Sequence, residues 1–517
     1  MTARAFSNRF TRLLAAALLL AVLPWAVINF AMVANADNLW LAEGYWRFTR
    51  GKGLRESFFE VNPPLSILLY AIPAEISAHF HVALHNAIFI YTLCAVALAA
   101  WVLYGLLQRL AFLHPGERIA ALAGFIVAST VMTTGFFGER DHFIALALAP
   151  LLLAQLIITQ DVTRSRCRIC CISFVCAVFL LLKPHFLLLP AAMILHRAVA
   201  RRSLLAVLRD EDVIALLLAG SGYAVLLLWL FPDYLFHILP AVVEYYGLQK
   251  ARDTLAMMLL QYLGGAAVLA ALAFKIVNSA PVRRFTWFLT AMAVLALVPF
   301  VVQGLGYAYH LIPATTLFWM ALTLILYHAV LKQNESKPAF AALLAIALCA
   351  AGAYAAKSPQ RSFISHDAYR ELPLVRAARD CGHERCSAFI FGPSFEISYL
   401  VGYYAEASFA SRFGALFFLP RQLAFPPESP DRALYRALVA EDLRRYKPDT
   451  VMLASFEIVR GRGDFNFVEY FSHDPVFREE WRHYERIGYI EAPFDDYLKD
   501  MKKNGEDIMR FDIYRRR

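Results

Sequence analysis

Ionisable side chains interrupt the apolar runs of this sequence at four places. Asp37 directly follows a long apolar run, in ANADNLWLAEGYW. The other three places are GERDH at 138–142, KPH at 183–185 and QGLGYAYH at 303–310. A charged group at membrane depth is costly, so it needs a partner, a water-filled cavity or a function. We therefore take these four segments as the candidates for chemistry.

The segment 138–142 holds Glu139, Arg140, Asp141 and His142 in succession. One interpretation is an interfacial ion pair of Arg140 with Glu139 or Asp141. The other is a pocket lining that surrounds a polar headgroup with cationic and acidic side chains. Four such residues are more than a helix cap needs, and their number favours the pocket.

The two remaining segments also have a plain and a functional interpretation. Lys183 and His185 flank a proline, so two short half-spans would meet at a basic turn suited to phosphate. The plain interpretation is a lysine that extends to the membrane surface. Tyr307 and Tyr309 alone would be an aromatic belt. Gln303 and His310, however, make the segment 303–310 more polar than an aromatic belt requires.

The composition indicates a membrane protein. The chain has 517 residues, of which 59% are hydrophobic and only 18% are charged, so most of it must face lipid. The net charge is +9, but the basic residues fall mostly in short loops between apolar runs. That placement is typical of membrane topology. We find no basic patch with interleaved aromatic residues, and we exclude nucleic acid as a partner.

Eleven apolar runs are long enough to be membrane spans. They are 13–33, 86–108, 119–136, 142–159, 169–182, 184–200, 213–231, 254–274, 285–302, 310–331 and 338–356. The first could instead be a signal peptide, because ANA before Asp37 resembles a cleavage site, but its length favours an uncleaved anchor. Residues 64–84 are broken by Pro73, Glu75 and two histidines, and we expect a re-entrant or interfacial segment there.

Basic loops predict the sidedness of the chain. Segments 108–118, 161–168, 201–212 and 275–285, with the basic N-terminus, should lie in the cytoplasm. They share one side only if 64–84 does not cross the membrane. The four candidate segments and the C-terminal domain then lie together on the outer face.

The sequence predicts two domains, a transmembrane domain at 1–356 and a soluble α/β domain at 357–517. Short apolar strands such as SAFIFG and DTVMLA alternate with polar helical stretches in the second. Residues 37–63 form an external loop of the first. Its apolar residues recur at helical spacing opposite basic ones, which predicts an amphipathic helix on the membrane interface, with Asp37 as a possible N-cap. The apolar residues of this predicted helix are Trp40, Leu41, Tyr45 and Phe48.

The cysteines do not predict a metal site. Cys167, Cys170, Cys171 and Cys176 lie in an apolar run without nearby histidines or acids, which suits small membrane-helix residues. Cys381 and Cys386 are different, because they could close a small disulfide loop if their domain lies outside the cytoplasm.

The order of these motifs resembles the GT-C glycosyltransferases, in particular the bacterial branch related to protein mannosyltransferases and the lipid A aminoarabinose transferase. The resemblance covers roughly residues 10–330 and is carried by Asp37, NPPLS at 62–66, GERDHF, LKPHF and GYAYHLIPA. Two positions depart from the usual pattern. Asn38 replaces the second acid of a pair, and Asn62 replaces a lysine before the two prolines, so donor contacts would have to come from elsewhere, such as Lys183.

The resemblance implies a polyprenyl-phosphate sugar donor and an acceptor from the cell envelope, which could be lipopolysaccharide, polysaccharide, lipid or protein. It implies a single inverting displacement with Asp37 as the general base. Cations would stabilise the leaving phosphate. The candidates for that role are Arg140, Lys183, His185 and His310. The remaining residues of the pocket are Glu139, Asp141, His142, Gln303, Tyr307 and Tyr309.

Some relatives hold a divalent cation, for which Glu139 or Asp141 with His310 are candidate ligands. Three other functions remain open. A transporter or flippase of lipid-linked saccharides predicts polar residues at mid-depth and an internal repeat. An O-antigen ligase or polymerase predicts a long external loop between late spans. A non-catalytic scaffold predicts that changes at Asp37 and Lys183 have no effect.

Overall fold

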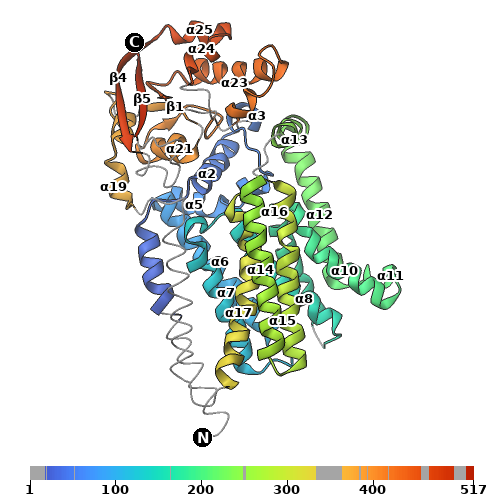
Figure 1. Cartoon of the computed structure of the whole chain (residues 1–517). Helices are drawn as coiled ribbons and strands as arrows, with labels where there is room; N and C mark the ends of the chain where they lie inside the picture. The colour runs from blue at the N-terminus through green and yellow to red at the C-terminus, as the bar shows by residue number, and fades with distance from the viewer. Residues whose placement is uncertain are drawn as a thin grey trace.

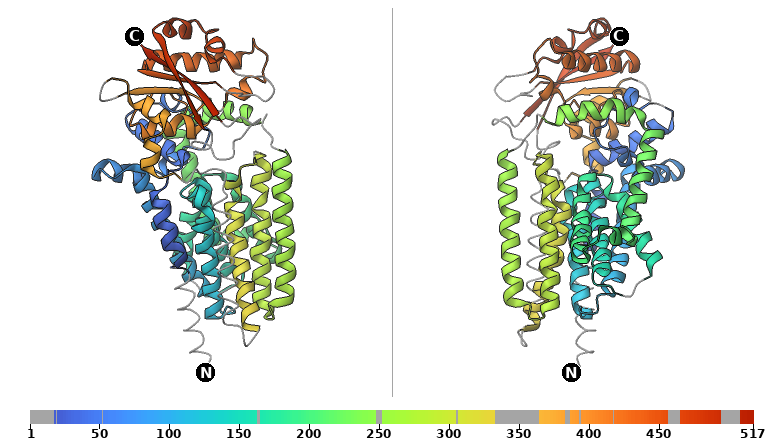
Figure 2. Two further views of the ribbon diagram at one scale, coloured as in Figure 1. Left: turned by 60° about the vertical axis from the view of Figure 1, so that its left-hand side comes forward. Right: turned by 90° about the vertical axis from the view of Figure 1, so that its right-hand side faces the viewer.

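The computed structural model describes residues 18, 20–51, 53–162, 165–247, 252–304, 306–332, 364–382, 386–392, 394–416, 418–455, 465–493 and 508–517. Helices run side by side through most of the chain and form a bundle, while the C-terminal segment adds a sheet domain that caps one end (Figure 1). The two further views show the same two layers (Figure 2). The fold is therefore a helical membrane bundle with a C-terminal α/β domain, as predicted.

Seven helices in the described residues are long and apolar enough to cross a membrane. They are Leu84–Leu107, Pro115–Phe136, Arg140–Thr159, Glu211–Leu230, Leu255–Ile276, Ala280–Gln303 and Ala308–Ala329. The chain is a multi-pass membrane protein. These seven coincide with seven of the predicted spans.

The bundle and its connections contain the following elements. They are α2 (Ala36–Thr49), α3 (Leu54–Ser57), α4 (Leu65–Leu68), α5 (Ala71–Phe80), α6 (Leu84–Leu107), α7 (Pro115–Ser129), η1 (Val131–Phe136), α8 (Arg140–Thr159), α9 (Arg166–Leu180), η2 (Pro184–Leu187), α10 (Leu188–Arg201), α11 (Leu204–Val207), α12 (Glu211–Leu230), η3 (Tyr234–Ile238), α13 (Leu239–Gly247), α14 (Arg252–Ile276), α15 (Ala280–Leu295), α16 (Leu297–Gln303), η4 (Ala308–Leu311) and α17 (Ile312–Lys332).

The remaining predicted spans differ from these long helices. The runs 169–182 and 184–200 correspond to the shorter helices α9 and α10, which meet at the turn around Pro184. Of the run 13–33, a helix at Leu20–Ala31 is described. The run 338–356 lies outside the described residues. The total of eleven crossings therefore stays a prediction.

The segment 64–84 forms the short helices α4 and α5, which pack against α2 at the end of the bundle that carries the C-terminal domain. In Figure 2, α5 lies across the bundle axis, and α6 starts from the same end. The arrangement agrees with a segment that returns without crossing. The loop between α14 and α15 lies at the opposite end of the bundle (Figure 1).

The C-terminal domain is built on a five-stranded sheet of order β2-β1-β3-β5-β4. Strands β1 and β3 are the two predicted apolar strands, and they pair in parallel, while β3 with β5 and β5 with β4 are antiparallel. The strands are β1 (Ser387–Phe391), β2 (Ser408–Phe409), β3 (Thr450–Ser455), β4 (Tyr484–Pro493) and β5 (Ile508–Arg516). The helices are α19 (His366–Arg370), α20 (Pro373–Arg379), α21 (Phe395–Tyr404), α22 (Leu419–Gln422), α23 (Pro430–Tyr446), α24 (Phe467–Phe471) and α25 (Pro475–Trp481).

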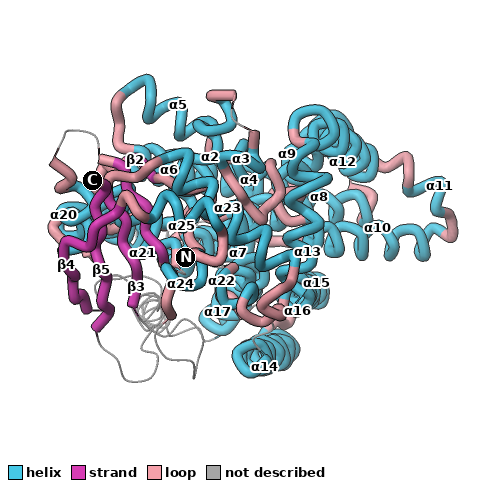
Figure 3. Tube along the Cα trace, turned by 90° about the horizontal axis from the view of Figure 1, so that it is seen from above, coloured by secondary structure: helices cyan, strands magenta, loops and turns pink. Residues whose placement is uncertain are grey.

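Seen from above, the sheet lies to one side, while α10 and α11 project from the other side of the bundle (Figure 3). Cys381 and Cys386 form a disulfide in the segment between α20 and β1. The predicted loop-closing bond is therefore present.

Helix α2 corrects the prediction of an amphipathic helix on the membrane interface. Trp40 and Leu41 are each 1% exposed, so neither ring nor chain reaches lipid. The Trp40 ring stacks on Phe58 with centroids 4.3 Å apart and meets the edge of Tyr399 from α21 at 5.1 Å. Trp40 is thus buried against Phe58 and the C-terminal domain, while the half-buried Phe48 stacks on Phe231 at the end of α12. Helical periodicity marks an apolar surface without specifying what covers it.

Candidate active site

Asp37 lies in the first turn of α2 and is not its N-cap. Asn35 is the cap, and its side-chain oxygen accepts a hydrogen bond from the Asn38 backbone N–H at 3.2 Å. The capping interpretation of Asp37 is therefore wrong. Its side chain is 29% exposed, so the carboxylate remains open to a substrate.

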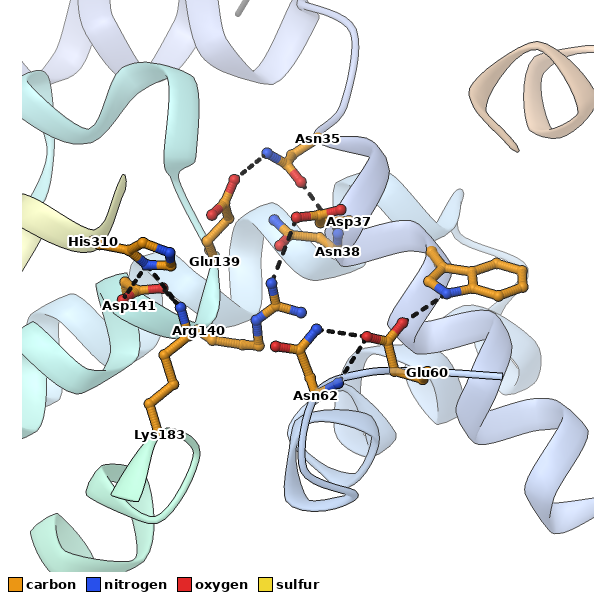
Figure 4. Close-up of polar contacts among 12 residues, drawn as sticks. Asn35, Asp37, Asn38, Glu60, Asn62, Glu139, Arg140, Asp141, Lys183 and His310 are labelled. Atoms are coloured by element: carbon orange, nitrogen blue, oxygen red, sulfur yellow. Dashed lines mark hydrogen bonds and ion pairs between the residues drawn. The ribbon is translucent and has the colours of Figure 1, made fainter. Parts of the chain in front are cut away.

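Arg140 is the nearest cation to Asp37. One of its terminal nitrogens lies 3.5 Å from the Asp37 carboxylate, although the two residues belong to different helices (Figure 4). The Arg140 side chain is only 5% exposed. Its Nε is buried without a hydrogen-bond partner among the described residues. Arg140 thus places a positive charge and an unused N–H donor beside the partly exposed Asp37 carboxylate.

Glu139 points away from this pair toward the start of α2. Its Oε1 accepts a hydrogen bond from the Asn35 side-chain amide at 2.6 Å. Burial raises the pKa of Glu139 well above its usual range, and the nearby Asp37 carboxylate adds to the effect. Glu139 therefore keeps its proton to a higher pH than an ordinary glutamate, so a smaller fraction of it is in the ionised form that can accept a proton.

Glu60 is a member of the cluster that sequence reasoning missed. It accepts hydrogen bonds from Trp40 Nε1 at 2.8 Å and from the Asn62 backbone and side-chain nitrogens at 3.0 and 2.5 Å. Burial raises its pKa, and the positive charge of Arg140 opposes that rise. Asn62 thus orients Glu60. An acid within the apolar run FFEV was the available signal.

Asn38 ties α2 to the turn that precedes α8. Its side-chain nitrogen donates to the Phe137 carbonyl at 3.1 Å. The Tyr70 hydroxyl lies 2.8 Å from Asn38 Oδ1 and 2.7 Å from the Gly138 carbonyl oxygen. Asn38 thus joins the first turn of α2 to the turn in front of Arg140.

Asp141, Lys183 and His310 form a second, fully buried cluster beside the first (Figure 4). Lys183 Nζ lies 2.6 Å from Asp141 Oδ2 and 2.9 Å from His310 Nδ1, and Asp141 Oδ1 lies 3.3 Å from the same ring nitrogen. The ammonium also stands 5.0 Å from the centroid of the Tyr309 ring. Three chain segments are joined here, and the charges of Lys183 and Asp141 compensate each other.

The remaining candidates lie on the border of this cluster. His185 Nε2 and Gln303 Nε2 are 2.8 Å apart, so the segments 183–185 and 303–310 meet as expected for one pocket. The rings of Tyr307 and Tyr309 stack with centroids 5.5 Å apart. Tyr307 is 38% exposed, while Tyr309 is half-buried.

His142 does not join the other candidates. Its side chain is fully buried, and its Nδ1 accepts a hydrogen bond from the Gly138 backbone N–H at 3.1 Å. The ring packs on Phe137 with centroids 5.1 Å apart. The ring of His142 thus stabilises the turn before α8, and its place in a pocket stays a prediction.

The described residues contain no group of three histidine, cysteine or acidic side chains that could hold a metal ion. Lys183 Nζ occupies the place between Asp141 and His310 that a bridging cation would need. Glu139 is bonded to Asn35. The residues present therefore do not fit the metal set considered from the sequence, and we derive no step through a metal.

The comparisons with solved structures identify the fold. The structure of the arabinofuranosyltransferase AftD from Mycobacteria matches 98% of this chain and 40% of its own, at 16% identity and a TM-score of 0.50. A mutant form of AftD gives a TM-score of 0.51 over 98% of this chain and 41% of that chain. The chain has a GT-C fold.

The match to AftD covers only part of that protein, because the chain spans about 40% of the length of AftD. The apo structure of ArnT from Cupriavidus metallidurans matches 88% of this chain and 93% of its own, at 11% identity and a TM-score of 0.38. No protein-family model and no curated protein sequence matches the chain. The GT-C fold thus stands on structural similarity, and the chemistry must be argued from the site.

Proposed function

We propose that this protein is a glycosyltransferase that moves a sugar from a polyprenyl-phosphate donor to a cell-envelope acceptor. The acceptor class is lipopolysaccharide, polysaccharide, lipid or protein. The observation that carries the proposal is the pair of a partly exposed carboxylate, Asp37, and a buried arginine, Arg140, whose Nε lacks a partner in the described structure. A base and a phosphate-binding cation are the two groups that this reaction needs.

In this proposal, Asp37 accepts the proton of the acceptor hydroxyl while that oxygen attacks the anomeric carbon of the donor. The bond from that carbon to the phosphate oxygen breaks, and the polyprenyl phosphate leaves with the electron pair. A single displacement inverts the anomeric configuration. The leaving phosphate is already an anion, so it needs positive charge and little proton donation.

Differences in burial support Asp37 as the base. Glu60, Glu139 and Asp141 are 5%, 3% and 0% exposed, whereas the Asp37 side chain is 29% exposed. Glu60 and Glu139 also have raised pKa values caused first by burial. Asp141 is neutralised by Lys183. A substrate hydroxyl therefore meets Asp37 more easily than the other three acids.

The same contacts rank the proposed phosphate ligands. Lys183 and His310 already contact Asp141, so they are less available to bind the donor phosphate directly. Arg140 has a spare donor and comes first. His185 is partly exposed and contacts Gln303, which suits a second ligand on the open border.

The orientation belongs to the proposal as well. We place the multi-pass chain in the bacterial inner membrane, with the N-terminus in the cytoplasm and the C-terminal domain in the periplasm. The site and that domain lie at one end of the bundle, and the basic loop at 275–285 lies at the other, which supports this orientation. Polyprenyl-linked donors would then reach Asp37 from the outer leaflet.

The test is turnover by the wild type and by Asp37→Asn. Each purified protein is incubated with polyprenyl-phosphate sugars and an envelope extract, and free polyprenyl phosphate is measured. Loss of the base should lower the rate about 10²- to 10⁴-fold. Asp233→Asn removes a partly exposed carboxylate outside the cluster and should retain the wild-type rate.

Each outcome of this test has a clear meaning. Equal turnover by Asp37→Asn, with equal stability, would move the base to Asp141 or Glu139. Absence of turnover by the wild type with every donor would contradict the transferase proposal. The transporter and scaffold functions would then remain, and lipid binding and transport would be measured.

A further inference from the structure

A second site lies between α2 and the C-terminal domain, away from the ion pair of Asp37 and Arg140. It is a cleft of about 490 Å³ bordered by the second half of α2, the second half of α21, strand β2 and the end of α23. This volume falls within the range of small-molecule sites, about 300–1,000 Å³. Helices α2 and α21 lie next to each other in Figure 1.

Five aromatic side chains line the cleft. They are Trp46, Tyr399, Tyr403, Phe409 and Tyr446. Tyr399 is 4% exposed and is held by its hydroxyl, which donates to the Leu39 carbonyl at 3.3 Å, and Phe409 is also buried. The rings of Trp46, Tyr403 and Tyr446 are only half-buried. Such rings offer flat apolar faces together with polar edges. A ligand with both apolar and hydroxyl-bearing surfaces would fit them.

The charged residues of the cleft compensate one another. Arg47 is committed, because its guanidinium donates to Glu43 and to the Ser57, Ser411 and Phe409 carbonyls. Arg50 is exposed, and Glu406 on the opposite side pairs with Arg370 at 3.2 Å. An anionic ligand such as a phosphate would meet as much negative as positive charge here. A neutral polar ligand is therefore favoured.

Tyr446 supplies a group that nothing in the described structure satisfies. Its hydroxyl is buried and has no hydrogen-bond partner among the described residues, although the side chain borders the cleft. A buried hydroxyl without a hydrogen-bond partner is unfavourable, and a ligand that bonds to it would supply the missing partner. This points to a ligand that donates or accepts hydrogen bonds.

The position of the cleft relates it to the proposed reaction. Glu43 lies six positions after Asp37 in the same helix, which corresponds to a rise of about 9 Å. Helix α21 also approaches both places, since Tyr399 borders the cleft and the Glu396 carboxyl is close enough to Asp37 to feel its charge. A chain of linked sugar rings is the type of molecule that could occupy both places.

We propose that this cleft binds a neutral oligosaccharide portion of the acceptor, with Trp46 as the stacking platform and Tyr446 as a hydrogen-bonding group. The identity of the ligand as acceptor rests on the proposed transferase function. Binding itself does not depend on turnover. The two proposals can therefore fail separately.

The test uses the purified full chain in detergent on an array of bacterial envelope oligosaccharides, with wild type, Trp46→Ala and Tyr446→Phe compared. The wild type should bind at least one neutral oligosaccharide. Trp46→Ala should weaken that binding about tenfold through the lost ring face. Tyr446→Phe, which keeps the ring and the fold, should weaken it about three- to tenfold.

Trp101→Ala is the matched control, because Trp101 is 68% exposed on α6, far from the cleft, and should leave binding unchanged. Absence of binding by the wild type, or equal binding by Trp46→Ala and Tyr446→Phe, would overturn the proposal. Selective binding of phosphorylated headgroups in place of neutral sugars would overturn it too. If binding follows the prediction but no donor is turned over, the cleft stands and the transferase function fails.

Discussion

The contact between Asp37 and Arg140 joins two residues that the sequence places more than a hundred positions apart. Both were predicted as functional because charged groups beside apolar runs are costly. Their pairing was not predictable from single-sequence reasoning, which proposed partners for Arg140 only among its neighbours Glu139 and Asp141. Those neighbours turn to Asn35 and Lys183 instead.

Arg140→Gln should retain the fold and lower turnover about 10²- to 10³-fold, because it removes the buried charge and the spare Nε donor. Arg140→Lys should be intermediate, since an ammonium keeps the charge without the planar fork. The measurement is the rate of polyprenyl phosphate release at saturating donor. Arg209→Gln, an exposed arginine far from the site, should match the wild type. Equal rates for Arg140→Gln and the wild type would remove Arg140 from the phosphate site.

At the scale of elements, the sequence predicts where the helices lie in the chain more reliably than whether lipid or protein covers them. The long apolar runs form spans because a helix of about 20 apolar residues crosses the hydrocarbon core and makes all its backbone hydrogen bonds internally. Helix α2 was assigned to the membrane interface, because its aromatic stripe would suit lipid or protein equally. Only the C-terminal domain, hundreds of residues later, determines which of the two covers Trp40.

Gly44 tests how closely α2 is packed. A Cβ atom at this position would meet the ring of Phe58, which itself stacks on Trp40. Alanine normally stabilises a helix interior relative to glycine. Here, Gly44→Ala should instead destabilise the protein by about 1–3 kcal/mol, because the Phe58 ring must move. Thermal unfolding in detergent measures the change.

Gly222→Ala in α12 is the control, since no atom lies within 4 Å of its added Cβ. It should be neutral or stabilising. A Gly44→Ala protein as stable as the wild type would show that Phe58 repacks freely.

At the scale of the whole molecule, Arg47 links the membrane bundle to the C-terminal domain. It donates to the Ser411 carbonyl at 2.6 Å and the Phe409 carbonyl at 2.9 Å, while its Nε holds Glu43 at 2.8 Å. Arg47→Met should cost about 3–5 kcal/mol, because a half-buried carboxylate and several buried carbonyls lose their partner. Faster protease cleavage at residues 364–416 is the expected readout.

Arg55→Met removes an exposed arginine near the same end and should be cleaved like the wild type. Unchanged protection in Arg47→Met would mean that the aromatic contacts of Trp40 suffice to hold the domain. The prediction concerns the docking of the domain, so cleavage within the bundle should not change.

Helix α2 lies between the helical bundle and the C-terminal domain, so its burial is delayed until that domain has been synthesised. Leu39 and Tyr399, which share a hydrogen bond, are 360 residues apart in the chain. At about 5–20 residues per second, a ribosome needs about 20–70 s to synthesise the distance between them. During that interval the apolar stripe of α2 has no domain to cover it. The membrane surface or a chaperone must therefore shield Trp40 and Leu41 in every newly made molecule until the last third of the chain emerges.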